Sequence, residues 1–277
     1  MLTTLLIMLA VSVLIVLMVA VVIWLDVAFR RGQVQTDREK TVHRWQPPFA
    51  RGNDLLNWAK DTAARIAGKR LVGKRTADTA RELSAELHDG AIRAMLPLVP
   101  DRETERMVAC PDGGQGAIGV MAPEVLEIAD YIRHKLSRRE RNRIHGLAQK
   151  NAERLADREH AQFDADELPC PLQNDNGVCR VYAARPLQCR PLHAAKIARQ
   201  FGMETSGADG EIPPWPAHVL LIEDGVKEGL VRELESAGLD ANVYELNGAL
   251  VTALDTPHAA QRWARGEDVF AGCQRYR

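Results

Sequence analysis

Three cysteines lie close together in a segment that is rich in turn-forming residues. Cys170, Cys179 and Cys189 fall within a stretch of twenty residues. The turn-forming residues in and around this stretch are Pro169, Pro171, Gly177, Pro186 and Pro191. Soft metal ions such as zinc and iron are bound by thiolates on backbone that curls around the ion, and proline and glycine favour such turns. The segment therefore predicts a metal site with the three cysteines as ligands.

Arginines accompany these cysteines along the chain. Several thiolates give a metal site a net negative charge, which neighbouring cations offset while they hydrogen-bond the sulfurs. The candidates for this role are Arg180, Arg185 and Arg190. None of the three cysteines forms a Cys-x-x-Cys pair, so burial as small apolar side chains is the alternative interpretation. The turn-rich context favours the metal site.

The same segment resembles the signature of a known family. The sequence CPLQNDNGVCRVYAARPLQCR, residues 170–190, resembles that of the YkgJ family of cysteine-cluster proteins, described as zinc- or iron-chelating domains. Upstream, Cys110 and the following GAIGVMAPEVLEIADYI are similar to the part of the family that carries its first cysteines, a short extended piece and a helix. The resemblance covers roughly residues 110–192. The positions that match the signature are Cys170, Gly177, Cys179, Tyr182, Arg185, Pro186, Cys189 and Arg190.

The resemblance implies a fourth ligand. Family members carry several cysteines in the first cluster, whereas this chain has Cys110 alone. Together with the later three, Cys110 completes a set of four thiolates, which suffices for one tetrahedral zinc or iron ion or for one iron–sulfur cluster. His193 lies one helical turn after Cys189 and is an alternative ligand. Cys273 is far away near the C-terminus and is not expected to take part.

Three kinds of function are compatible with these residues. The first is a metal-binding module without visible catalysis, because the chain has no phosphate loop, no His-Glu-x-x-His and no Gly-x-Ser-x-Gly motif. The second is an iron–sulfur-dependent protein-modifying enzyme, since the same signature resembles that of proteins linked to flagellin lysine methylation. The third is a membrane-bound interaction protein with a vestigial metal site. A net charge of −1 argues against a general nucleic-acid binder, and protein partners cannot be read from the sequence.

The chain begins with a long apolar stretch. Residues 2–25 contain no charged side chain, which is enough for a helix that spans a lipid bilayer. Basic residues follow this stretch and none precedes it, namely Arg30, Arg31, Arg38 and Lys40. By the positive-inside rule we expect an uncleaved single-pass anchor in the inner membrane, with the rest of the chain in the cytoplasm. An odd number of cysteines, five, agrees with a reducing compartment.

The remainder of the chain is predicted to be mainly α. Apolar residues recur at helical spacing over residues 53–68, 76–96, 123–136, 137–155, 226–237 and 246–253, with a last helix opened by Thr256 and Pro257. Ser137 and Glu140 read as a capping box, and no strand pair is expected. The predicted organisation is an anchor over residues 1–31, a linker over 32–52, a helical extension over 53–100, and an irregular helical domain with a cysteine-rich metal-binding loop over 101–277.

One locally basic stretch lies near the predicted anchor. It comprises Lys60, Arg65, Lys69, Arg70, Lys74 and Arg75. Such a stretch is typical of a solvated helix face followed by a turn, and it is also compatible with contact to anionic lipid head groups.

Overall fold

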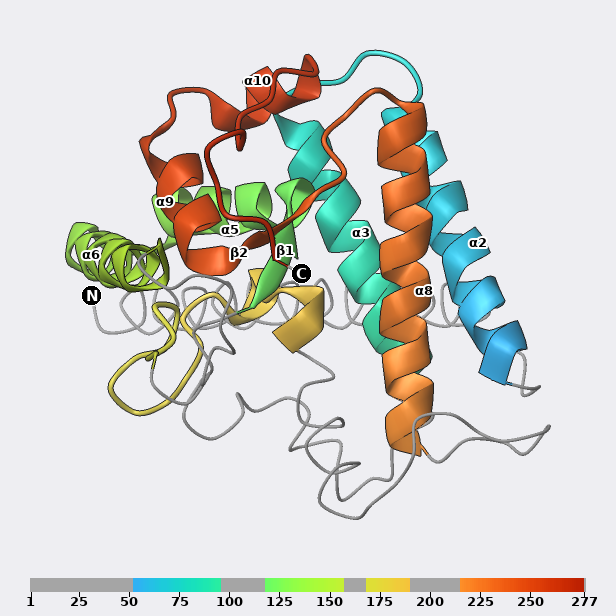
Figure 1. Ribbon diagram of the computed structural model, residues 1–277, viewed down its shortest axis with the longest axis horizontal. Coiled ribbons are helices and arrows are strands. Elements are labelled where there is room, and N and C mark those ends of the chain that lie inside the picture. Colours follow the sequence, from blue (N-terminus) through green and yellow to red (C-terminus); the bar gives the residue numbers. More distant parts are fainter. Residues whose placement is uncertain (1–51, 96–117, 157–167, 190–214, 277) are drawn as a thin grey trace, which may run out of the picture. The chain divides into compact units, whose positions relative to one another are not determined.

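The computed structural model describes residues 52–95, 118–156, 168–189 and 215–276 (Figure 1). The predicted anchor and nearly all of the predicted linker lie outside these residues, as do Cys110, Arg190 and His193. Among the helices that are described, none combines the length and the apolar character needed to cross a membrane.

The described residues are mainly helical, as the apolar periodicity predicts. The α-helices are α2 (Gly52–Leu71), α3 (Asp78–Met95), α5 (Ala122–Lys135), α6 (Arg138–Ala156), α8 (Trp215–Ser236), α9 (Leu246–Asp255) and α10 (Ala259–Ala264). Two short 3₁₀ helices, η4 (Tyr182–Ala184) and η5 (Leu187–Cys189), lie in the cysteine-rich segment. Helix α8 starts eleven residues earlier than the predicted residue 226, because Ala217, Val219 and Ile222 continue its buried face.

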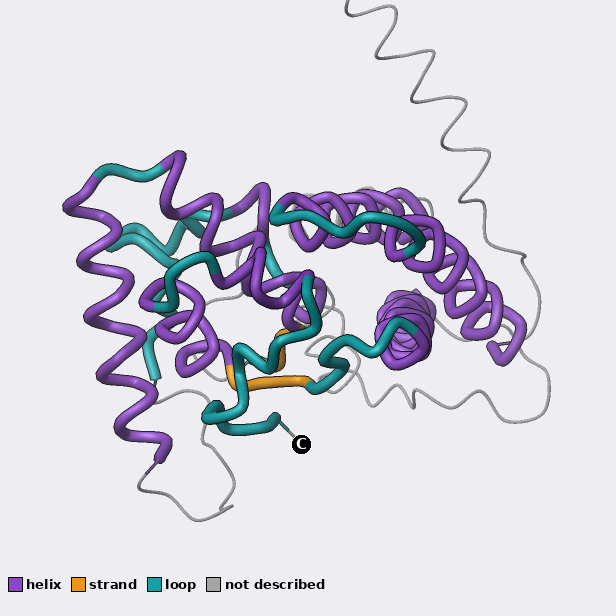
Figure 2. Tube along the Cα trace, turned by 90° about the horizontal axis from the view of Figure 1, so that it is seen from above, coloured by secondary structure: helices purple, strands orange, loops and turns teal. Residues whose placement is uncertain are grey.

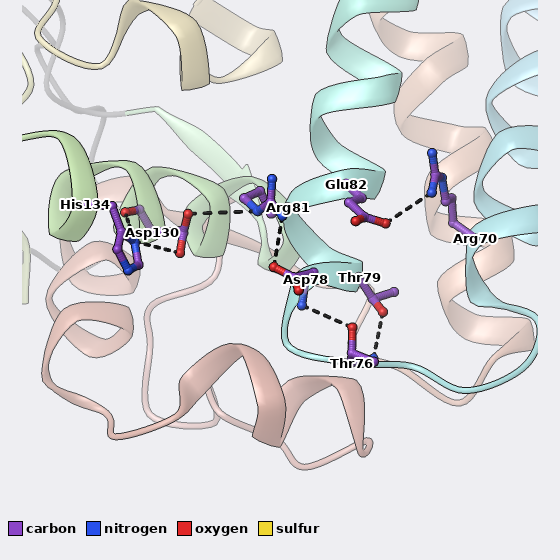
Figure 3. A network of polar contacts seen from close by, with 8 residues as sticks. All are labelled: Arg70, Thr76, Asp78, Thr79, Arg81, Glu82, Asp130 and His134. Carbon is purple, nitrogen blue, oxygen red and sulfur yellow. Dashed lines mark hydrogen bonds and ion pairs between the residues drawn. The ribbon is translucent and has the colours of Figure 1, made fainter.

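Side-chain caps explain where several helices begin. The predicted capping box of α6 is confirmed, since Ser137 N–H donates to Glu140 Oε2 at 3.1 Å and Glu140 N–H donates to Ser137 Oγ at 3.3 Å. Before α3, Thr76 N–H donates to Thr79 Oγ1 at 2.8 Å (Figure 3). Helix α8 ends before Gly238, whose φ of 65° is the left-handed conformation that favours glycine at a helix C-terminus.

The prediction that the chain has no strand pair was wrong. Strand β1 (Gly119–Met121) pairs antiparallel with β2 (Val243–Glu245), with Val120 opposite Tyr244 (Figure 2). Each strand has three residues, too few to show the alternation by which a strand is recognised in a sequence. The pair forms because each strand leads directly into a helix, α5 and α9 respectively, and both helices pack on the same core.

Helix α2 packs along α8, where small residues allow the two backbones to approach closely (Figure 1). Gly225 and Gly229 of α8 face Ala59 and Ala63 of α2, and a Cβ on either glycine would collide with the α2 backbone. Helix α3 also packs on α5 and α8. Contacts therefore cross the predicted boundary at residue 100, which itself lies outside the described residues.

Candidate metal centre at the cysteine loop

Residues 168–189, called the cysteine loop here, are built from turns, as their composition predicts. Its first part folds back on itself: Asn174 N–H donates to the Val178 carbonyl at 2.9 Å, and Arg180 N–H donates to the Leu172 carbonyl at 2.7 Å. Gly177 has a φ of 74° in the turn between them, which explains the glycine there. The helices η4 and η5 form the second part.

The three cysteines of the loop occupy different environments. Cys170 and Cys189 are buried, and Cys179 is partly exposed, in a β-bridge with Gln173. The backbone at both buried positions is hydrogen-bonded within the loop, since the Cys170 carbonyl accepts from Gln173 at 3.3 Å and Cys189 N–H donates to Pro186 at 3.1 Å. Two of the predicted ligands are thus held in ordered turns.

Cys273 lies apart from this loop. Its Sγ is 3.2 Å from Oγ1 of Thr252 on α9, and burial raises the pKa of its thiol. A raised pKa disfavours the thiolate, which is the form that binds metal.

The predicted four-cysteine site extends beyond the described residues, because Cys110 lies in the segment 96–117. Within residues 52–95, 118–156, 168–189 and 215–276, no group of three or more His, Cys, Asp or Glu side chains is placed so that it could hold a metal ion. Cys170, Cys179 and Cys189 all belong to this part of the chain and do not form such a group by themselves, whereas Cys110 and His193 lie outside it.

The predicted arginines differ in their surroundings. Arg185 is 1% exposed; its Nη2 donates to the Cys189 carbonyl, and its guanidinium lies 5.8 Å from the centre of the Tyr182 ring. Arg180 instead pairs with Glu140 of α6, with Nη1 2.9 Å from Oε1. Arg185 thus fixes the turn that carries Cys189, whereas Arg180 links the loop to a neighbouring helix.

One end of the cysteine loop is attached to β1 and α5. Leu187 N–H donates to Oε1 of Glu124 at 2.8 Å, and Gly119 N–H donates to Oε1 of Gln188 at 2.6 Å. Gly119 begins the strand that follows Cys110 in the sequence, and Gln188 directly precedes Cys189. Strand β1 and the residue before Cys189 therefore meet at this point.

The other end of the loop is attached to α6. Asn151, which is buried, donates through Nδ2 to the Pro169 carbonyl at 2.9 Å and to Oδ1 of Asn247 at 3.0 Å. Arg143 Nη1 donates to the Gln173 carbonyl at 2.6 Å. The loop is thus hydrogen-bonded to helices at both ends by side chains of the protein.

A buried acid–base cluster that was not predicted from the sequence contacts η5 through Glu124. His88 Nε2 lies 3.0 Å from Oε1 of Glu124, and His88 Nδ1 lies 3.6 Å from Oε2 of Glu127. Burial by itself would raise the pKa of Glu124. The hydrogen bond and charge of His88 act in the opposite direction, as do the hydrogen bonds from the N–H groups of Leu187 and Met121. Together they hold the pKa of Glu124 below its usual range. The signal was present in the sequence, because His88 falls on the apolar face of α3 that contains Leu87.

A small cavity of about 30 Å³ lies next to this cluster, between α3, α8 and the strand pair. Apolar side chains such as Leu87, Leu187 and Val226 line it, together with Glu223 of α8. Burial, with the nearby charge of Asp224, raises the pKa of Glu223 to about 8. The carboxyl is therefore mainly protonated at neutral pH. The volume suffices for a water molecule.

Comparisons of the chain with protein-family models, with characterised proteins and with solved structures found no match.

Proposed function

We propose that this chain is a single-pass membrane protein whose cysteine loop binds zinc, iron or an iron–sulfur cluster. The anchor over residues 1–31 would hold the protein in the inner membrane, with the irregular helical domain and its metal-binding loop in the cytoplasm. In this proposal the protein is a degenerate relative of the YkgJ family, and its metal ligands are Cys110, Cys170, Cys179 and Cys189.

The observation that supports the proposal most directly is the hydrogen bond between Gly119 and Gln188. It joins the strand that follows Cys110 to the residue that precedes Cys189. Cys110 is nine residues before Gly119, and nine residues span at most about 30 Å when extended, so a position of Cys110 at the loop is within reach of the chain.

The donor chemistry of the loop also supports a soft metal ion. Thiolates are the ligands that zinc and iron–sulfur clusters share. A positive charge near the ligands stabilises such a site, and the buried guanidinium of Arg185 supplies one at Cys189. The metal, when bound, would crosslink the loop to the segment of Cys110, while the protein's own residues fix the turns around it.

Metal analysis of the full-length chain, purified anaerobically, tests this function. We expect close to one zinc or iron equivalent, or more iron in the case of a cluster, and loss of it in Cys170→Ser and Cys189→Ser. Cys273→Ser is the matched control and should keep the metal, because Cys273 contacts Thr252 rather than the loop.

A loss of stability in a cysteine variant does not by itself show metal binding, since a buried cysteine also stabilises the protein by packing. A chelator should therefore lower the melting temperature of the wild type and of Cys273→Ser, but not that of Cys189→Ser. A metal-free wild type that is insensitive to the chelator would contradict metal binding and favour the vestigial site. A brown protein with iron and sulfide would favour the protein-modifying enzyme.

The proposed anchor is tested separately. A reporter fused after residue 277 should show cytoplasmic behaviour, and removal of residues 1–31 should release a soluble protein. Activity of a periplasm-specific reporter at that position would reverse the orientation.

A further inference from the structure

The connection between α2 and α3 projects an apolar side chain into solvent. Leu71 is buried at the end of α2, whereas the next residue, Val72, is 81% exposed. Gly73 follows with a φ of 93°, a conformation that allows the chain to turn directly after Val72. We call residues 69–75 the basic tip, because its other residues include Lys69, Arg70, Lys74 and Arg75.

The two arginines of the basic tip hold it in place. Arg70 pairs with Glu82 at 3.1 Å (Figure 3) and with Glu86 at 2.7 Å, and both glutamates lie on α3. Arg75 Nη1 donates to the Ala237 carbonyl at the end of α8, at 3.0 Å. The tip is thus fixed against two helices.

The two lysines of the basic tip are available for a partner. Lys69 and Lys74 are exposed, and neither has an ion pair with any residue of the described part of the chain. Glu233, whose carboxylate lies beside Gly68, is already paired with Arg232 at 3.2 Å. Positive charge therefore remains in excess around Val72.

A cationic loop with an exposed apolar residue at its apex fits the surface of an anionic phospholipid bilayer. The lysines would contact lipid phosphates, and Val72 would enter the region between the head groups and the acyl chains. Each basic residue close to an anionic membrane strengthens binding about fivefold, which is weak for a free protein. A membrane anchor on the same chain raises the effective concentration of the tip at the bilayer, so weak binding suffices.

The lengths of the segments allow this contact. Helix α2 has 20 residues and is therefore about 30 Å long, which separates the basic tip from the start of α2. A linker of about twenty residues can span up to roughly 65 Å when extended. The chain can thus leave the bilayer at the anchor and return to it at the basic tip.

We propose that the basic tip docks on the cytoplasmic surface of an anionic phospholipid membrane. The proposal rests on the anchor that the proposed function includes. Docking would restrain the orientation of the helical domain relative to the bilayer, since α2, α3 and α8 all contact the tip.

Hydrogen exchange of the full-length chain in lipid vesicles tests the docking. The chain is reconstituted in vesicles of phosphatidylcholine, with or without phosphatidylglycerol. We expect the amides of residues 71–77 to exchange several-fold more slowly in the anionic vesicles, and high salt to abolish the difference. The double variant Lys69→Gln, Lys74→Gln should lose most of this protection, and Val72→Ser part of it.

The matched control is Lys135→Gln, Lys150→Gln, which removes two exposed lysines from α5 and α6 and should behave as the wild type. Equal exchange in both lipids, or protection that survives in the double variant, would overturn the docking. If the chain fails to enter vesicles, the anchor is wrong, and co-sedimentation with added anionic vesicles then decides the docking alone. Salt-sensitive binding of the wild type to these vesicles, absent in the double variant, would support the docking. Absence of binding by the wild type would overturn the docking.

Discussion

Nε2 of His88 on α3 lies 3.0 Å from Oε1 of Glu124 on α5, and both side chains are buried. The same carboxylate accepts hydrogen bonds from the N–H groups of Met121 and Leu187. The buried side chain of Glu124 thus connects α3, the end of β1 and the cysteine loop. The position of η5 therefore depends on α5, since Glu124 is 63 residues before Leu187 in the chain.

Replacement of Glu124 by Gln should destabilise the protein by about 1.5–3 kcal/mol, because a buried carboxylate that accepts several hydrogen bonds is replaced by a neutral amide whose NH₂ group faces other donors. The lost stabilisation is greatest above the pKa of an unfolded glutamate. It decreases as the pH falls through the lower pKa of Glu124 in the folded state. Urea unfolding at several pH values measures it.

The control for this variant is Glu153→Gln on the exposed face of α6, which should change the free energy of unfolding by less than about 0.5 kcal/mol. Hydrogen exchange of residues 184–189 should accelerate in Glu124→Gln only. Unchanged exchange there would show that Glu124 does not position the loop.

Replacement of Glu223 by Gln should change the pH dependence of stability. The pKa of Glu223 is raised to about 8 in the folded protein, so its burial is favourable while the carboxyl is protonated and becomes costly when it ionises. The wild type should therefore lose stability relative to Glu223→Gln as the pH rises from about 4.5 to about 8, by up to roughly 5 kcal/mol. Parallel stability curves for the two proteins over this range would contradict the raised pKa.

Replacement of Gly225 by Ala should destabilise the protein by about 1–3 kcal/mol, because the new methyl group would lie 2.5 Å from the Leu56 carbonyl oxygen of α2. Gly146→Ala on α6 is the matched control. A Cβ at residue 146 meets no atom within 4 Å, so this variant should gain up to about 1 kcal/mol from the better helix propensity of alanine. Thermal unfolding of both variants measures the contrast, and a stabilised Gly225→Ala would show that α2 and α8 can separate.

Replacement of Arg185 by Lys should loosen the cysteine loop without removing a predicted ligand. Lysine keeps the charge but has no planar guanidinium, so the hydrogen bond to the Cys189 carbonyl and the stacking over Tyr182 weaken. If the loop binds metal, we expect affinity to fall about 10- to 100-fold, less than the complete loss in Cys189→Ser. A competition titration with a chelator compares the two; equal loss would mark Arg185 as essential to the fold of the loop.

Much of the local structure could be predicted from the sequence. The helices follow from apolar residues at a spacing of three and four, and the start of α6 follows from Ser137 and Glu140. The turns of the cysteine loop follow from its prolines and from Gly177. These features depend on neighbours within a few positions, and such neighbours are visible in the sequence itself.

Contacts between distant segments could not be predicted in the same way. Val120 pairs with Tyr244 across more than one hundred residues, and Gly229 meets Lys60 across an even longer separation. The three-residue strands have no periodic signal. From the sequence alone, the glycines of α8 are expected only to lower the stability of that helix. Their role in the close packing of α2 on α8 is visible only in the structure.

The sequence by itself determined that this protein is mainly helical, where most of its helices lie, and that its cysteines gather in a segment of turns. Only the tertiary structure decided that this segment is held by Glu124, Gln188 and Asn151, and that His88 belongs to its support. The physical reason is that helix periodicity and turn formation are properties of adjacent residues. The partner of a buried charge, by contrast, depends on which helices share a core, and packing over the whole domain selects it.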